Sequence, residues 1–167
     1  MTTDPFTLTY NAIWSLLTAS TEFTALVKPN NRISFAGASR QPEKLAVQDA
    51  DFPEVRLQPL GGEFGPQRDT SGRTWIERFE IVMSTGDQRV HERLFPVRWA
   101  IVRALSNWPT VLPALEWNSQ KFARRLELQT TNVGTSQIDM TRGIDGWAAI
   151  ATIEVYMCFS NSNLTGA

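Results

Sequence analysis

The sequence predicts an α+β fold of two layers, in which two main helices pack on one face of an antiparallel sheet of about four strands. Three observations support this expectation. Apolar residues recur with a helical period in two segments, they alternate with a period of two in four others, and the segments follow the order α-β-β-α-β-β. The 167 residues are close to the usual length of one domain, so we expect a single domain over the whole chain.

The first helix is expected to begin at Pro5. The Asp4 carboxylate can accept hydrogen bonds from the free N–H groups of the first turn, and proline has no N–H to leave unpaired. Residues 18–21, a cluster of Thr, Ala and Ser, then interrupt the pattern, and a shorter helical piece is expected over residues 22–27. The stripe of apolar residues before the interruption comprises Phe6, Tyr10, Ile13, Trp14 and Leu17.

A first pair of strands is expected in the middle of the chain. Residues 32–35 could form a short strand, whereas residues 37–52 have no sustained period and are expected to be a flexible loop. Residues 54–58 alternate, with Val55 and Leu57 on one face. The sequence therefore predicts a short, half-buried strand that ends where a proline and two glycines follow.

A long, flexible hairpin loop is expected over residues 61–72, since this segment contains four glycines and a proline between two strands. In the strand that follows, one face is apolar except for Glu77. The apolar residues of that face are Trp75, Phe79, Ile81 and Met83.

The second helix is expected after Asp87, which can cap it. Because Pro96 lies inside the helical pattern, two stacked pieces are expected rather than one straight helix. The apolar stripe of this segment comprises Val90, Leu94, Val97, Ile101 and Leu105.

Two further strands complete the predicted sheet. The third is expected at residues 122–129, and residues 130–145 are expected to be a flexible loop. Residues 147–159 are apolar at every second position and predict a central strand. Residues 160–167 are expected to be a frayed tail. The face of the sheet turned away from the helices would carry charges of both signs: Glu54, Arg56, Arg78, Glu80, Arg125, Glu127 and Glu154.

Composition argues against several classes of function. Lys and Arg (16) almost balance Asp and Glu (17), giving a net charge of −1, whereas proteins that bind duplex nucleic acid usually carry a basic excess. No apolar run approaches the roughly 18 residues of a membrane-spanning helix. We therefore expect neither nucleic acid nor a membrane as the main ligand.

No catalytic centre is apparent in the sequence. His91 is the only histidine, so a histidine-based triad or a two-histidine metal site would need a second chain. Cys158 is the only cysteine, and we expect it to be buried and inert. The glycines around Phe64 lack the Lys-Ser or Lys-Thr of a phosphate-binding loop. Accordingly, we predict no catalytic residue, no cofactor and no metal ligand.

Tryptophan is frequent for a chain of this size, with six residues. Trp99, Trp108 and Trp117 lie near the end of the second helix. Two explanations remain open: these side chains form part of an interface, or they cover a small satellite core under the segment between Trp108 and Trp117.

Part of the chain is similar to a known family. Residues 85–90 and 94–105 read TGDQRV and LFPVRWAIVRAL, and they resemble the second helix of tail terminator (tail completion) proteins of long-tailed bacteriophages, or of closely related neck and tail-to-head joining proteins. The strand entry at residues 52–55 and the order α-β-β-α-β-β fit that family as well.

The resemblance implies a virion structural protein without enzyme activity. Such a protein forms a hexameric ring that caps the tail tube and joins it to the head, and it is assembled in the host cytoplasm. Its partners would be copies of itself, the tail tube protein and a head connector or neck protein, and DNA would only pass through the ring lumen. The alternatives are another neck or tail-tube component, or a monomeric protein- or ligand-binding module.

If the resemblance holds, interface residues are expected in the long loops and on the second helix. Phe64 and Arg68 belong to the predicted loop 61–72, and the loop 130–145 is a second candidate. On the second helix a basic side is either a solvated face or a contact with acidic residues of a neighbour. Its arginines are Arg89, Arg93 and Arg103, with Arg98 nearby.

Overall fold

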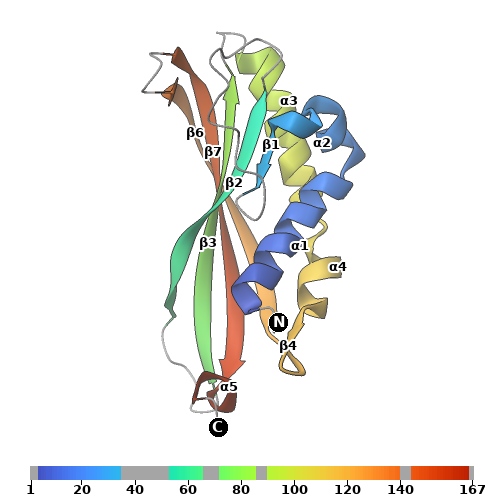
Figure 1. Cartoon of the computed structure of the whole chain (residues 1–167), viewed down its shortest axis with the longest axis vertical. Coiled ribbons are helices and arrows are strands. Elements are labelled where there is room, and N and C mark those ends of the chain that lie inside the picture. Colours follow the sequence, from blue (N-terminus) through green and yellow to red (C-terminus); the bar gives the residue numbers. More distant parts are fainter. Residues whose placement is uncertain (1–3, 35–52, 66–71, 86–89, 140–143, 166–167) are drawn as a thin grey trace.

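The computed structural model describes residues 4–34, 53–65, 72–85, 90–139 and 144–165. The expected loop over residues 37–52 lies outside these ranges. The described helices are α1 (Pro5–Ala19), α2 (Thr21–Leu26), the short 3-10 helix η1 (Pro29–Asn31), α3 (Val90–Leu105), α4 (Trp108–Val111), the 3-10 helix η3 (Leu112–Ala114) and α5 (Asn161–Thr165). Helices α1 to α4 lie together on one face of a long sheet (Figure 1), so the predicted two-layer α+β class is confirmed.

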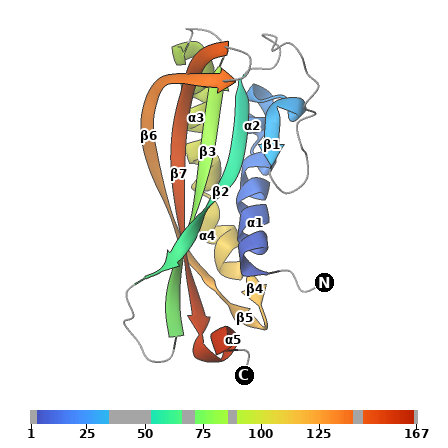
Figure 2. The same ribbon diagram turned by 60° about the vertical axis from the view of Figure 1, so that its left-hand side comes forward.

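The sheet has the order β1-β2-β3-β7-β6. Its strands are β1 (Arg32–Ser34), β2 (Glu54–Phe64), β3 (Gly72–Thr85), β6 (Ala123–Asp139) and β7 (Ile144–Ser160), and a separate hairpin joins β4 (Glu116–Trp117) to β5 (Gln120–Lys121). The four long strands are antiparallel, as predicted, and β1 adds a short parallel strand beside β2. Figure 2 shows the sheet from the side away from the helices.

Helix α1 begins as the sequence predicts. The Asp4 carboxylate accepts hydrogen bonds from the Thr7 N–H at 2.9 Å and from the Thr7 hydroxyl at 2.7 Å, and Pro5 occupies the first turn. The Tyr10 hydroxyl donates to the Leu57 carbonyl at 2.9 Å and ties the helix to β2. Ser20 ends α1 and caps α2, which explains why the polar cluster divides the two helices.

Removing the Asp4 cap should cost a measurable part of the stability. The hydrogen bond from the Thr7 N–H is the main cause that lowers the pKa of Asp4 below its ordinary value of 3.8. The stabilisation is therefore present above that value and is lost as the pH falls through the lower pKa of the folded state. Asp4→Ala should lower the free energy of unfolding by about 1 kcal/mol at neutral pH. Urea unfolding at neutral pH and near pH 2 measures this difference, and an equal difference at both values would contradict the assignment.

The expected hairpin loop over residues 61–72 is too long. Strand β2 continues through Pro59 to Phe64, because a bulge at Leu60 absorbs one residue and Gly61 takes a positive φ of 87°. The pairing then resumes with Gly62 opposite Glu77. Glycine at the bulge therefore prolongs the strand rather than ending it.

The expected loop over residues 130–145 is also wrong for most of its length. Strands β6 and β7 continue to pair as far as Asp139 and Ile144. The segment is polar, so its alternation is hard to recognise, but it is rich in threonine, which suits extended backbone. Register shifts between Thr130 and Val133 and between Gln137 and Asp139 keep the strands paired. The tail predicted to fray at residues 160–167 contains the short helix α5.

Helix α3 is continuous through Pro96, so the expected division into two pieces is wrong. Proline removes one backbone hydrogen bond at a cost of about 3 kcal/mol. The packing of the helix offsets that cost, because its buried residues lie on both sides of the proline and contact one core. These residues are Leu94, Val97, Ala100, Ile101, Ala104 and Leu105. Asp87, the expected cap, lies outside the described residues.

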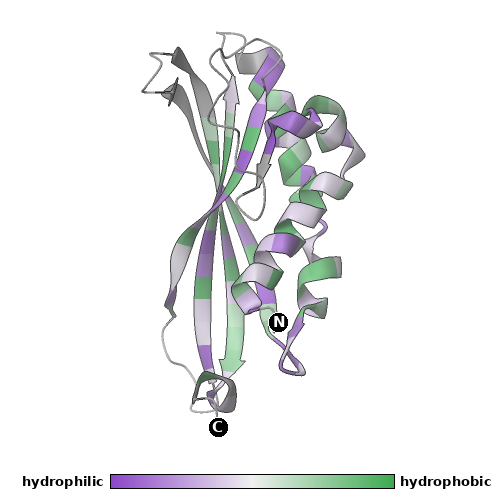
Figure 3. Cartoon of the chain, viewed as in Figure 1, coloured by the Kyte–Doolittle hydropathy of each residue, from purple (hydrophilic) through white to green (hydrophobic). Residues whose placement is uncertain are grey.

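The core lies between the helices and the covered face of the sheet. Strand β7 contributes every second residue from Ala149 to Phe159, as its alternation predicts. From β3 the core takes Phe79, Ile81 and Met83. Figure 3 shows hydrophilic and hydrophobic residues alternating along the strands. The consequence is a sheet with one covered face and one open face.

Candidate assembly surfaces

The open face is the side of the sheet turned away from the helices. The alternation of strand residues and the bulge at Leu60 decide which side chains reach it. Before the bulge the even-numbered residues of β2 point to this face, and after it Glu63 does so. Of the ionic residues predicted for this face, Arg78 and Glu154 pair between strands, whereas Arg56 pairs with Glu54 and Arg125 with Glu127 within one strand. Glu63 joins them by pairing with Arg78.

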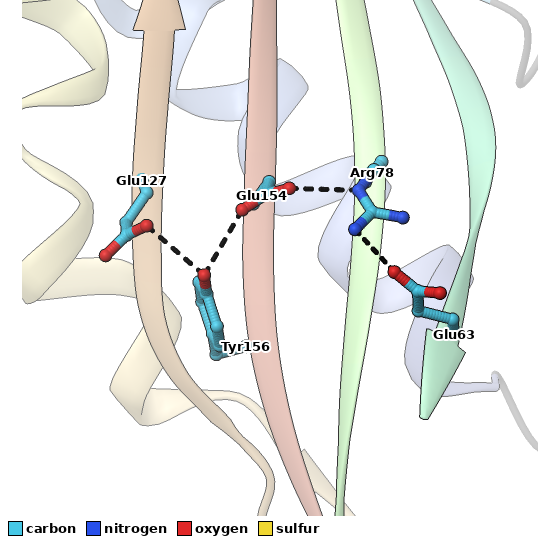
Figure 4. A network of polar contacts seen from close by, with 5 residues as sticks. All are labelled: Glu63, Arg78, Glu127, Glu154 and Tyr156. Atoms are coloured by element: carbon cyan, nitrogen blue, oxygen red, sulfur yellow. Dashed lines mark hydrogen bonds and ion pairs between the residues drawn. The ribbon is translucent and has the colours of Figure 1, made fainter. Parts of the chain in front are cut away.

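A chain of ion pairs and hydrogen bonds crosses four strands on the open face (Figure 4). Arg78 of β3 lies opposite Glu154 of β7, and its Nε is 2.9 Å from Glu154 Oε1. The other end of the same guanidinium reaches Glu63 Oε1 at 2.7 Å. Both hydrogen bonds raise the pKa of Arg78, with that of Glu63 first. Arg78 therefore holds two carboxylates of neighbouring strands.

Tyr156 extends this network to β6. Glu127 and Glu154 are directly opposite in register, an unfavourable arrangement for two like charges. The Tyr156 hydroxyl lies 3.2 Å from a carboxylate oxygen of each and can donate to either, and the Arg125 guanidinium stacks 4.2 Å above the Tyr156 ring. Burial of the hydroxyl raises the pKa of Tyr156, and the two glutamates add to the effect.

Similar pairs continue toward the other end of the face. Arg56 contacts the nearly buried Glu54 at 3.2 Å, and the Gln58 side-chain amide donates to Glu80. These contacts hold the charged and polar side chains of the face in fixed positions. The open face can therefore either contact another protein or remain exposed to solvent.

The Arg78–Glu154 pair offers a direct test of this network. In a double-mutant cycle of Arg78→Met and Glu154→Gln, the coupling energy should be favourable at low salt and should shrink at about 1 M salt, because exposed charges are screened there. Urea unfolding of the four proteins provides the numbers, with Lys121→Met as an exposed control. A coupling energy of zero at low salt would show that the pair contributes nothing to the sheet.

A second surface feature lies at the end of the sheet near the start of α1. We call it the basal cluster, formed by Phe6, Phe64, Arg73 and Trp75. Trp75 makes edge contacts with Phe64 at 4.9 Å and with Phe6 at 5.8 Å, and the Arg73 guanidinium lies over the Phe64 ring at 5.3 Å. Phe64, an expected interface residue, is 47% exposed. It stands at a strand end rather than in a loop.

The buried Glu77 accounts for the glycine in the opposite strand. Trp75 Nε1 donates to Glu77 Oε2 at 2.6 Å, which satisfies a carboxylate on the apolar side of β3. Gly62 lies across from Glu77, and a Cβ at Gly62 would come closer than 3.0 Å to this pair and to the Ile76 carbonyl oxygen. Glycine at this position therefore leaves room for the hydrogen bond.

The expected basic side of the second helix is only partly described. Arg68 and Arg89 lie outside the described residues. Arg93 is half-buried, and Arg103 is exposed and forms an ion pair with Glu22 of α2 at 3.2 Å. This pair borders a hollow of about 520 Å³ between α1, α2 and the end of α3. Of the expected interface residues that the structure describes, Phe64 lies on β2, and Arg93 and Arg103 lie on α3.

The tryptophans divide between the two explanations. Trp108 and Trp117 pack against the core, and Trp117 contacts the buried Phe159 edge-on at 6.1 Å, as a satellite core requires. Trp99 is different, because 58% of its surface is exposed on the outer side of α3. Helical spacing places it beside Phe95, which is 41% exposed. Sequence spacing could have singled out this pair.

The side chain of His91 lies outside the described residues. The prediction that Cys158 is buried is wrong: the thiol is exposed on the open face, 3.8 Å from the Thr74 hydroxyl. Strand alternation explains this, since Cys158 lies on the same side as Glu154 and Tyr156. Within the described ranges no three His, Cys, Asp or Glu residues form a group that could hold a metal. None of the helices described is long and apolar enough to cross a membrane.

Comparison with known proteins adds little to this geometry. No protein-family model matches the sequence, and no curated protein is similar to it. Among solved structures, the chain is similar to one titled "Virion of native gene transfer agent (GTA) particle", with 18% identity, 88% of this chain and 93% of that chain covered, and a TM-score of 0.46. A likeness of this size carries no argument about function.

Proposed function

We propose that this protein is a structural, non-catalytic component of a phage-type virion, and more specifically a tail terminator whose copies form a ring at the end of the tail tube. The proposal starts from the resemblance of residues 85–90 and 94–105 to that family. In the proposed assembly, this protein contacts further copies of itself, the tail tube protein and a head connector or neck protein.

The observation that supports this role best is the sheet with its one open face. Long strands carry a network of ion pairs and hydrogen bonds across that face, from Glu63 to Glu127. A contact surface has to be rigid and of fixed polarity, and charges that neighbouring strands hold in place meet both needs. The basal cluster at one end of the sheet and Trp99 on the outer side of α3, away from the open face, add exposed apolar anchors.

Ring formation also fits the asymmetry of the molecule. Its helices lie on one side and its open sheet face on the other (Figure 1). When unlike surfaces of identical copies meet, the contact is heterologous, and it closes into a ring if the rotation between copies allows closure. A hexamer is the ring size that the family resemblance implies.

The test is the mass and shape of the purified full chain. We expect size-exclusion chromatography with light scattering to detect a species of about six subunits, as the resemblance implies, and negative-stain images to show annular particles. Measurement over a range of protein and salt concentrations should give the same species. A strict monomer at all concentrations would favour the alternative of a monomeric binding module, and open fibres would contradict a closed ring.

A further inference from the structure

We propose that the outer face of α3, with Trp99 at its centre, docks on the open sheet face of a second copy of this chain. The contact places Trp99 and Phe95 against Val82 and Ile150 of the neighbour, with Arg98 facing its Glu80. This inference rests on the proposed function, because it names the contact from which the ring is built.

The helix side of this contact is apolar at its centre and has charges of both signs at its margins. Phe95 and Trp99 lie one turn apart, and 41% and 58% of their surfaces are exposed. Glu92 precedes Phe95 by three residues and Arg98 follows it by three, whereas Arg103 is held by Glu22 of α2. Tryptophan and arginine are the residues most often found at energetic centres of interfaces.

The sheet side offers an aliphatic spot with an acidic residue beside it. Val82 and Ile150 are directly opposite in register and half-buried, so they form an aliphatic spot between polar residues of the open face. Glu80 lies two residues from Val82 on the same face. Glu54 is buried and paired with Arg56, so the ionic residues of the face that are not buried comprise four glutamates and three arginines: Glu63, Glu80, Glu127, Glu154, Arg56, Arg78 and Arg125. Glu80, beside the aliphatic spot, suits Arg98 as a partner.

Geometry favours a second copy as the occupant. The α3 face and the open face lie on opposite sides of one molecule (Figures 1 and 2), so one copy cannot join them by itself. In a row of copies, each junction covers the α3 face of one copy and the open face of the next. Only the two end copies of an open row each keep one of these faces exposed. Closure into a ring removes these ends.

The decisive experiment is a position-specific crosslink. The photoreactive residue p-benzoylphenylalanine replaces Trp99 in the full chain, and equal amounts of isotopically light and heavy protein are mixed before irradiation. We expect mixed light–heavy products joining residue 99 to peptides that contain Val82 or Ile150. The inference would be overturned by products that form only within one chain, or by products that join residue 99 to other surfaces of the neighbour. A wild-type chain that stays monomeric would overturn it as well.

An energetic test uses a matched pair of variants. Trp99→Ala should weaken self-association by roughly 30-fold, the factor that corresponds to a loss of about 2 kcal/mol at an interface hot spot. Leu164→Ala removes another exposed apolar side chain, 41% exposed on α5, and should change association less than roughly twofold. Sedimentation equilibrium gives both constants, and circular dichroism confirms that each variant is folded.

The single thiol provides a third test of the contact. Cys158 is the only cysteine and lies exposed on the open face, roughly 27 Å along β7 from Ile150, so its alkylation rate should stay unchanged when the wild-type chain associates through Val82 and Ile150, and a fall would place the contact elsewhere on the face. Rings that persist unchanged in Trp99→Ala would overturn the inference and leave the proposed function standing. Association that depends on Trp99 but yields only dimers or open chains would support the inference and contradict the proposed ring.

Discussion

Replacing Phe79 by alanine is expected to lower the free energy of unfolding by about 3–5 kcal/mol, the largest effect of any single change considered. Phe79 is 1% exposed in the middle of β3, and its ring lies 6.1 Å from that of Tyr10 on α1. The side chain therefore fills the space between the sheet and the helix layer. The loss combines the transfer energy of the ring with the cavity that remains, because packed elements relax only in part.

Urea unfolding followed by tryptophan fluorescence measures this change. Ile76→Ala is a suitable control, since Ile76 is on the same strand and half-buried but its side chain points to the open face, away from the contact proposed for Val82. We expect that variant to lose less than about 1.5 kcal/mol. Similar losses for both variants would mean that the two faces of the sheet are not divided into core and surface as described.

The second large effect is expected at Gly62. In Gly62→Val the new side chain must displace the Ile76 carbonyl oxygen or the Trp75–Glu77 hydrogen bond. Overpacking of this kind costs about 1–3 kcal/mol, and a Glu77 carboxylate that loses its donor adds to the loss. The end of β2 should separate from β3, so amide hydrogen exchange should rise from Gly62 to Phe64.

Gly65 provides the matched control for this substitution. A Cβ at Gly65 would meet Thr74 atoms no closer than 3.6 Å, which is ordinary contact. Gly65→Ala should therefore leave both stability and hydrogen exchange near the wild-type values. If Gly62→Val were as stable as Gly65→Ala, the close approach at Gly62 would have no structural role.

Periodicity predicted the helices and the centre of the sheet well, and the reasons are specific. The stripe of α3 and the alternation of β7 both reflect burial against one core, and burial is what a hydrophobic pattern records. The same logic failed for residues 130–139, because that part of the hairpin is polar. It failed for Pro96 because packing on both sides outweighed a local helix breaker.

The surfaces could be predicted only in part. The charges of the open face follow from alternation, since Arg78 and Glu154 fall on the polar side of their strands. Glu63 joins these charges only because of the bulge in β2. The sequence marks that bulge only by two adjacent glycines. The special position of Trp99 depends on three-dimensional burial, which separates it from Trp108 and Trp117 although all three looked alike along the chain.

The bulge at Leu60 also constrains how this strand can change during evolution. The residues before it and the residues after it follow opposite parities, so adding one residue to the regular part of the strand would exchange the inward and outward residues at its end, whereas deleting the bulged residue would restore regular pairing without moving them. Homologous chains should therefore either keep the bulge with its glycine or be one residue shorter here and free of the need for Gly61. Length variation in this one strand thus records whether the bulge has been kept.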